Sequence, residues 1–283
     1  MPPGFKELFR SRNLSSQSPL PSRGYSSQAS TPQDPPAQPS QTISPASTAT
    51  NAPAPLAAIR EGYNYGVNVL HDGNSRASVD IVFVHGLTGN AYDTWLHKDT
   101  KVHWPGELLR QDIPDVRILS FGYDADIVGF WNPTSNSRLS NHAENMVGEL
   151  VRKRERTNTE SRKILFVAHS LGGLVVEYAL RHSRNAAERH LHQVERCTAG
   201  IVFIGVPHHG ADLGSWAHLG TQMADILRRA NKDIVGILKP GSEMLRVVQK
   251  DFHSILRLRK DEETAIEITC FYEELPVIGV GEV

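Results

Sequence analysis

The sequence predicts an α/β domain built on a mostly parallel, doubly wound sheet, preceded by a disordered leader. From Val79 onward, short apolar runs alternate with amphipathic helical patterns, which is the order that a parallel sheet with helices on both faces requires. Residues 1–57 differ sharply, because they contain eleven of the seventeen prolines, many Ser, Gln and Thr, and only two acids. Such a segment cannot bury enough apolar surface to offset the entropy lost on ordering. The predicted boundaries are therefore a leader over 1–57 and one α/β domain over 58–283.

The predicted strands are continuous apolar runs, as expected where a sheet is covered on both faces. They occupy 81–84, 116–123, 163–169, 199–207 and 265–272. Helical patterns occupy 104–113, 139–151 and 171–182, and a helix-rich excursion covers 212–260. The clearest helix repeats its apolar residues with a period of 3.6 over 139–151. The charged run that follows it, Arg152 to Arg156, is interpreted as the solvated end of that helix.

Composition removes several classes of protein. The chain has 30 Lys and Arg against 31 Asp and Glu, so its charge gives no argument for binding nucleic acid or an anionic membrane. Its two cysteines, Cys197 and Cys270, cannot form a disulfide framework, and their places beside predicted strands indicate buried free thiols. No apolar run approaches the ~20 residues that span a bilayer. The first residues are basic, Ser-rich and poor in acids, which fits a mitochondrial transit peptide or an ordinary disordered leader.

The residues that carry chemistry lie where the strand over 163–169 meets the helix that follows. The junction reads Ala168-His169-Ser170-Leu171-Gly172, with small residues two before and two after the serine. Small residues there let the strand and helix backbones approach closely, and they place the serine on strained backbone at a helix N-terminus. This pattern predicts a nucleophile elbow with Ser170 as the nucleophile. A serine that only caps the helix is the alternative, and Ala168 replaces the glycine of the usual pattern.

A serine nucleophile needs donors for the oxyanion that forms when it attacks a carbonyl. The backbone N–H of Leu171, directly after the serine, is the first expected donor. The second usually comes from a turn after an earlier strand, which His85-Gly86-Leu87 supplies, so the Leu87 N–H is expected there. The alternative for this turn is a tight strand end with a hydrogen-bonded histidine.

The acid of a catalytic triad should follow a strand two strands after the elbow strand, because the chain order is Ser, acid, His. Glu273 lies at that point, where it would hold the histidine's tautomer and stabilise the imidazolium. Glu274 and Asp212 are the other candidates. An exposed pair of acids at a strand end, without a catalytic role, remains open for 273 and 274.

Five motifs appear in an order that resembles the lipase-like α/β-hydrolases of the serine-active-site-containing protein family, in its fungal form. They are Asp80–Gly89, Ser120–Ala125, Ala168–Val175, Gly205–Gly210 and Phe271–Pro276, within a similarity that covers about residues 62–283. The resemblance implies an α/β-hydrolase fold, a serine esterase of lipid metabolism without cofactor or metal, and Ser170 and Glu273 as catalytic residues. It also implies a mitochondrial or endoplasmic reticulum location, with the cytoplasm as the alternative. Val206 departs from the family's usual Thr.

The triad histidine is the gap in this pattern. Ten residues follow Glu273, fewer than a helix of ~11 residues and a strand of ~5 require, and none is a histidine. Among the thirteen histidines, His208 and His209 are the ones that could reach the site, while His190 and His192 lack further metal ligands. The expectation is a domain truncated at its C-terminus, without its last strand and with the histidine beyond Val283. The alternative is a non-catalytic or signalling module with a hydrolase fold.

A loop with Phe130, Trp131 and Pro133 is expected at the same end of the sheet as the elbow. It could line an acyl pocket for an ester substrate or make a peripheral contact with a membrane. A packed aromatic loop is the alternative. No nucleic acid is expected among the partners.

Overall fold

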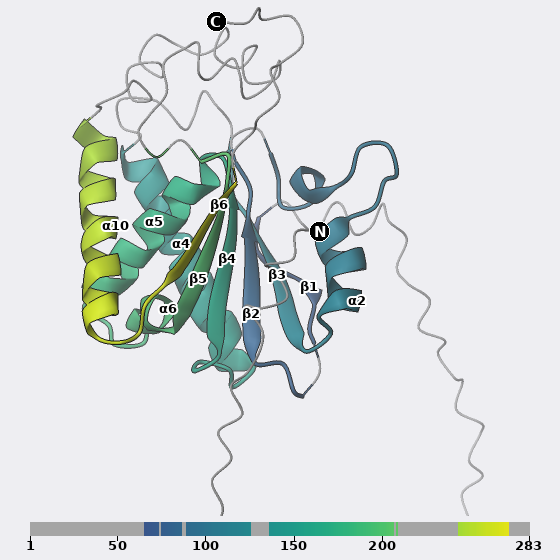
Figure 1. Cartoon of the computed structure of the whole chain (residues 1–283), viewed down its shortest axis with the longest axis horizontal. Coiled ribbons are helices and arrows are strands. Elements are labelled where there is room, and N and C mark those ends of the chain that lie inside the picture. The colour runs from purple at the N-terminus through teal and green to yellow at the C-terminus, as the bar shows by residue number, and fades with distance from the viewer. Residues whose placement is uncertain are drawn as a thin grey trace, which may run out of the picture. The chain divides into compact units, whose positions relative to one another are not determined.

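The structure, a computed structural model, describes residues 65–73, 75–86, 89–125, 136–206, 208 and 243–271; the predicted leader and its boundary lie outside these residues. Six strands form one sheet in the order β1-β3-β2-β4-β5-β6 (Figure 1). They are β1 (Gly66–His71), β2 (Val79–Val84), β3 (Val116–Gly122), β4 (Lys163–His169), β5 (Thr198–Ile204) and β6 (Glu267–Phe271). All neighbours from β3 to β6 pair in parallel, and β1 pairs antiparallel with β3. The predicted mostly parallel sheet is confirmed.

Helices cover both faces of this sheet. The helical elements are η2 (Asp93–Trp95), η3 (Pro105–Leu109), α2 (Arg110–Asp112), α4 (Asn136–Arg156), α5 (Gly172–Asn185), α6 (His192–Cys197) and α10 (Glu243–Asp261). The last four lie together on one side of the sheet (Figure 1). On the other side, Phe83 meets Trp95 from η2 and Trp104 from the start of η3, edge to face at 5.0 and 5.1 Å between ring centroids. The doubly wound arrangement is thus present.

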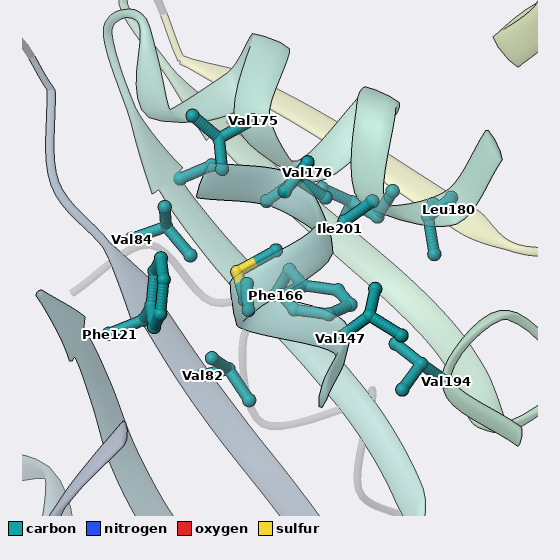
Figure 2. Packing of buried hydrophobic residues seen from close by; sticks show 14 of the residues in the cluster. Val82, Val84, Phe121, Val147, Phe166, Val175, Val176, Leu180, Val194 and Ile201 are labelled. Atoms are coloured by element: carbon teal, nitrogen blue, oxygen red, sulfur yellow. The ribbon is translucent and has the colours of Figure 1, made fainter. Parts of the chain in front are cut away.

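The main core lies between the sheet and helices α4 and α5. Figure 2 shows Phe166 of β4 packed against Val147 of α4 and Val176 of α5. Successive strand residues point to opposite faces, so Val82 and Val84 join this core while Phe83 faces the tryptophans. The helical period predicted over 139–151 is confirmed, since its apolar residues are all buried in this core.

Two edge strands differ from the sequence predictions. The strand β1 is missed, because its Val67 and Val69 alternate over a run too short and too polar to stand out, and all six residues are only half-buried. The strand β6 is found, but its side chains are exposed. The prediction of two buried thiols is therefore wrong for Cys270, which is exposed, while Cys197 is half-buried and its Sγ donates to the Glu160 carbonyl at 3.2 Å.

A buried ion cluster joins four elements at the amino ends of the parallel strands. Asp80 of β2 is fully buried and accepts two hydrogen bonds from Arg117 of β3, at 2.9 and 2.8 Å. It also pairs with Arg154 of α4 at 2.7 Å and with Arg162, just before β4, at 3.1 Å. The interpretation of 152–156 as only a solvated helix end is wrong at Arg154, which is 1% exposed because it turns inward to this carboxylate. The cluster fixes the register of β2, β3, β4 and α4 at one end of the sheet.

Candidate active site

The strand order places the candidate site at the reversal point of the sheet. From β2 the chain moves to β3 on one side, and then crosses back to β4 on the other side of β2. Ligands of open α/β sheets bind outside the carboxyl ends of the strands at such a point. His85 and Gly86 follow β2, and Ser170 follows β4, so two of the predicted motifs meet at this crevice position.

Ser170 has the backbone geometry of a sharp strand-to-helix turn. Its φ is +51°, in the left-handed region, which costs a residue with a Cβ about 1–2 kcal/mol. Its N–H donates to the Ile204 carbonyl at 2.8 Å, and its carbonyl accepts from the Gly173 N–H at 3.1 Å, so the turn is held from both sides. The Oγ is buried and has no hydrogen-bond partner among the described residues. The helix-capping alternative fails, because a capping serine would use this oxygen on an N–H of α5.

Two glycines allow the strand and helix to come this close. A Cβ on Gly172 would collide with the carbonyl oxygens of His85 and Val84 at the end of β2. A Cβ on Gly86 would lie 2.7 Å from the Ser170 Cβ. Ala168 sits fully buried in β4, opposite Val84 and Phe203, and fills the position of the missing first glycine without disturbing the strand. A small residue is therefore required two positions after the serine, as the spacing predicts, and another is required at the end of β2.

Of the two predicted oxyanion donors, only the Leu171 N–H lies among the described residues. Leu171 is fully buried at the start of α5, and no described residue accepts a hydrogen bond from its N–H. Such an N–H, next to the serine and at the positive end of a helix dipole, suits a developing negative charge. Leu87 lies outside the described residues, although Gly86 beside it touches the elbow.

His85 is a structural residue of the β2 end. Its Nδ1 lies 2.9 Å from the Gly86 carbonyl, and its Nε2 accepts from the Tyr123 N–H at 3.2 Å. The Tyr123 ring stacks on it at 4.3 Å, and the tyrosine hydroxyl donates to the His85 carbonyl at 2.8 Å. Burial lowers the pKa of His85 to about 4, so the ring is neutral near pH 7. With both nitrogens engaged, His85 is not available as a base for Ser170.

His208 is paired with a residue that the sequence reasoning missed. Its Nδ1 lies 3.0 Å from Oε1 of Glu177, a fully buried carboxylate in α5 whose Oε2 has no partner among the described residues. The His208 ring also packs edge-on against Phe203 of β5 at 4.6 Å between centroids. The signal for Glu177 is one charged residue inside the apolar run from Leu174 to Leu180. The pair ties the segment after β5 to the helix that begins at the elbow.

Several predicted residues lie outside the described part of the chain. These are the acids Glu273, Glu274 and Asp212, the histidine His209, and the loop with Phe130, Trp131 and Pro133. Their predicted roles stay predictions. Among the described residues, no three His, Cys, Asp or Glu side chains are placed to hold a metal ion. His190 is exposed, and His192 binds the Ala186 carbonyl through Nε2 at 2.7 Å. In the same part of the chain, no helix combines the length and apolar character needed to cross a bilayer.

The buried histidines predict a loss of stability in mild acid. His103 is 3% exposed, stacks on Tyr92, and has its pKa lowered by burial to about 4, as His85 does. Below pH ~6.5 these two histidines take up protons in the unfolded state but stay neutral in the folded state. Their contribution to the free energy of unfolding is therefore fully present above that pH and is lost as the pH falls toward 4. We expect each ring to lower the free energy of unfolding by about 2 kcal/mol at pH 5.

Urea unfolding at pH 7.5 and pH 5.0 measures this loss. The His103→Phe variant keeps a ring on Tyr92 but cannot titrate, so its loss between the two pH values should be about 2 kcal/mol smaller. An equal loss in both proteins would contradict a neutral, buried His103.

The parallel strand order and the strand–turn–helix at Ser170 together make this an α/β-hydrolase fold, which confirms the predicted fold class.

Residues 77–269 match the family described as "Putative serine esterase (DUF676)". Protein SERAC1 of Danio rerio is 35% identical over 181 residues, which cover 56% of this chain and 27% of that protein. Protein SERAC1 of Bos taurus is 30% identical over 239 residues, covering 77% of this chain and 34% of that protein. The chain thus spans about a quarter to a third of the length of these relatives. Among solved structures, the mature lipase BlEst2 of Bacillus licheniformis has a TM-score of 0.42 and 19% identity, over 70% of this chain and 66% of that chain.

Proposed function

Because this chain belongs to the DUF676 family, we propose that it hydrolyses carboxylic esters through an acyl-enzyme on Ser170. The observation that carries the proposal is the positive φ of Ser170 at the reversal point of the sheet, with an Oγ that no described residue uses. Backbone strain of this kind is kept where surrounding structure enforces it, and it concentrates at catalytic sites. Here Gly172 and Gly86 leave room for it, and the Ile204 carbonyl holds it.

In the proposed mechanism, the Ser170 Oγ attacks the ester carbonyl carbon and the alcohol leaves, so that the acyl group stays on the serine until water removes it. The Leu171 N–H, with the Leu87 N–H as its predicted partner, would stabilise the oxyanion. Such a donor is typically worth ~2.7–4 kcal/mol in the transition state. A histidine oriented by Glu273 would take the serine proton and return it to the leaving alcohol. Two of the described histidines at this end, His85 and His208, are engaged elsewhere.

The substrate class proposed is a lipid ester. The motif resemblance supports this choice, and it also supports a mitochondrial or endoplasmic reticulum location, which fractionation of the tagged full-length protein would test. The cytoplasm is the alternative location. A non-catalytic hydrolase-fold module remains the alternative function, and the experiment below separates it from an enzyme.

The test is labelling with a fluorophosphonate, which reacts with activated serines. The full-length protein should be labelled within minutes, and mass spectrometry of its peptides should place the adduct on Ser170. The Ser254→Ala variant is the matched control, because that serine lies on α10 and its hydroxyl donates to the Lys250 carbonyl and accepts from Arg257, both on the same helix. It should label as the wild type does. A folded protein that takes no label, or takes it on another residue, would contradict the proposal and favour the module.

A further inference from the structure

Four buried polar atoms, at the elbow and on segments beside it, have no hydrogen-bond partners among the described residues. They are Thr94 Oγ1, Trp95 Nε1, His169 Nδ1 and Ser170 Oγ. Trp95 is 3% exposed and Ser170 5%, so water reaches neither side chain freely. In folded proteins more than about 90% of such groups are paired, and an unpaired group calls for a partner from solvent or from a ligand. The catalytic proposal explains the serine hydroxyl, but it leaves the other three unexplained.

The first link between these residues is the turn after β2. A Cβ on Gly86 would lie 2.7 Å from the Ser170 Cβ and 3.3 Å from His169 Nδ1, so both side chains border this glycine. The Gly89 N–H donates to the Gly86 carbonyl at 3.2 Å, and a Cβ on Gly89 would collide with Thr94 Oγ1. Ser170, His169 and Thr94 therefore surround one short turn.

Trp95 joins the same group from η2. Its ring lies edge-on to His169, at 6.3 Å between centroids. The same ring packs edge-to-face on Phe83 at 5.0 Å, which fixes it on the face of the sheet opposite α4 and α5. His169 follows Ala168 in β4, and since strand residues alternate between faces it lies on that face as well. The neighbouring Thr94 belongs to the same turn of η2.

The chemistry of these atoms defines what they can bind. An indole Nε1 can only donate a hydrogen bond, and a threonine hydroxyl can donate as well as accept. Burial lowers the pKa of His169, so its ring is neutral and offers one N–H and one lone pair. Two donors and a neutral imidazole suit an oxygen atom without a charge. A fully apolar substrate group would leave all three unpaired, at a cost in binding.

We propose that Thr94, Trp95 and His169 form a hydrogen-bonding subsite for an oxygen acceptor that lies close to the scissile ester, as the neighbouring oxygens of a polyol ester do. The inference rests on the proposed function, because it describes the substrate of the same serine. It adds a selectivity for oxygen-substituted esters over plain alkyl esters. The residues that carry this selectivity come from η2 and from the position just before the nucleophile.

Matched ester pairs test the subsite. In the first pair, 2-methoxyethyl butanoate and butyl butanoate differ by one oxygen in place of one methylene in the alcohol part. In the second, ethyl 3-methoxypropanoate and ethyl pentanoate differ in the same way in the acyl part. For each protein the ratio of kcat/KM within a pair is measured, and comparison between proteins cancels the intrinsic reactivity of the esters. We expect the ratio to fall about tenfold from wild type to Trp95→Phe in at least one pair.

The variants separate the donor from the ring. Trp95→Phe keeps an aromatic ring against Phe83 but removes the N–H. Thr94→Val removes the hydroxyl at nearly constant volume, and it should lower the same ratio of kcat/KM values. Trp104→Phe is the control, because Trp104 packs on Phe83 in the same edge-to-face way but is not part of the subsite. It should keep the wild-type ratio.

Equal ratios in wild type, Trp95→Phe and Thr94→Val for both pairs, in a protein that takes the fluorophosphonate label, would overturn the subsite alone. A protein that neither takes the label nor cleaves any of the four esters would overturn the proposed function as well.

Discussion

Alanine at position 170 is expected to lower kcat/KM for ester hydrolysis by about 10⁴- to 10⁶-fold, which is the usual loss when a serine nucleophile is removed. Every step of the proposed reaction passes through this hydroxyl, whereas the remaining oxyanion donors can only assist a slow attack by water. The measurement is the initial rate of p-nitrophenyl butanoate hydrolysis by the full-length protein, with Ser254→Ala as the control. A Ser170→Ala protein that keeps more than a tenth of the wild-type rate would show that another residue performs the chemistry.

Glycine at the same position gives a companion result on stability. Ser170 holds a φ of +51°, and alanine would inherit the steric cost of its Cβ there while glycine would not. Ser170→Gly should therefore be more stable than Ser170→Ala by about 1 kcal/mol, with both proteins equally inactive. Urea unfolding of the two variants measures the difference. If alanine were the more stable of the two, the left-handed conformation of this residue would be wrong.

Alanine at position 80 is expected to lower the free energy of unfolding by about 3–5 kcal/mol, because it leaves buried arginines without their counter-charge. Arg117 and Arg154 are each 1% exposed, and both direct guanidinium donors at this one carboxylate. Against a typical total of about 5–15 kcal/mol, the loss is large enough to reduce the folded yield at 37 °C.

The control for this substitution is Asp115→Ala. It removes an ion pair of the same type, with Arg76 at 3.0 Å, but one whose side chains are 48% and 74% exposed. Exposed pairs contribute about 0–1 kcal/mol, so this variant should unfold almost as the wild type does. Urea unfolding at pH 7.5 compares the three proteins. Similar losses for Asp80→Ala and Asp115→Ala would contradict a structural role for the buried cluster.

The sequence predicts the central strands and the elbow well because both follow from short-range rules. A strand covered on both faces must be apolar throughout, which makes β2 and β4 predictable from local patterns. A tight strand-to-helix crossing must have small residues at fixed offsets, which makes the turn at Ser170 predictable in the same way. The edge strand β1 obeys neither rule. The positions of the acid and the histidine of a triad depend on where distant segments of the chain end. Chain order therefore suggests Glu273 as the acid but does not predict where its side chain lies.

Buried charges cannot be predicted from local sequence patterns. Arg154 stands in a run of charged residues, and its local pattern is that of an exposed helix end. Only the approach of Asp80, 74 residues earlier, draws it inward. The same holds for Glu177 and His208, which are 31 residues apart and have no local reason to meet. A lone charged residue between apolar ones, as in Val79-Asp80-Ile81 and Val116-Arg117-Ile118, indicates a partner of opposite charge elsewhere in the chain.

The ion cluster and the elbow occupy opposite ends of the same parallel strands. Asp80 lies near the amino end of β2, and Ser170 lies beyond the carboxyl end of the adjacent β4. Changes at sites on opposite ends of a sheet usually combine additively. Thermal stability can therefore be changed by substitutions around the arginines without altering the site. Inactive variants that trap bound substrate can be made at the serine without altering that stability region.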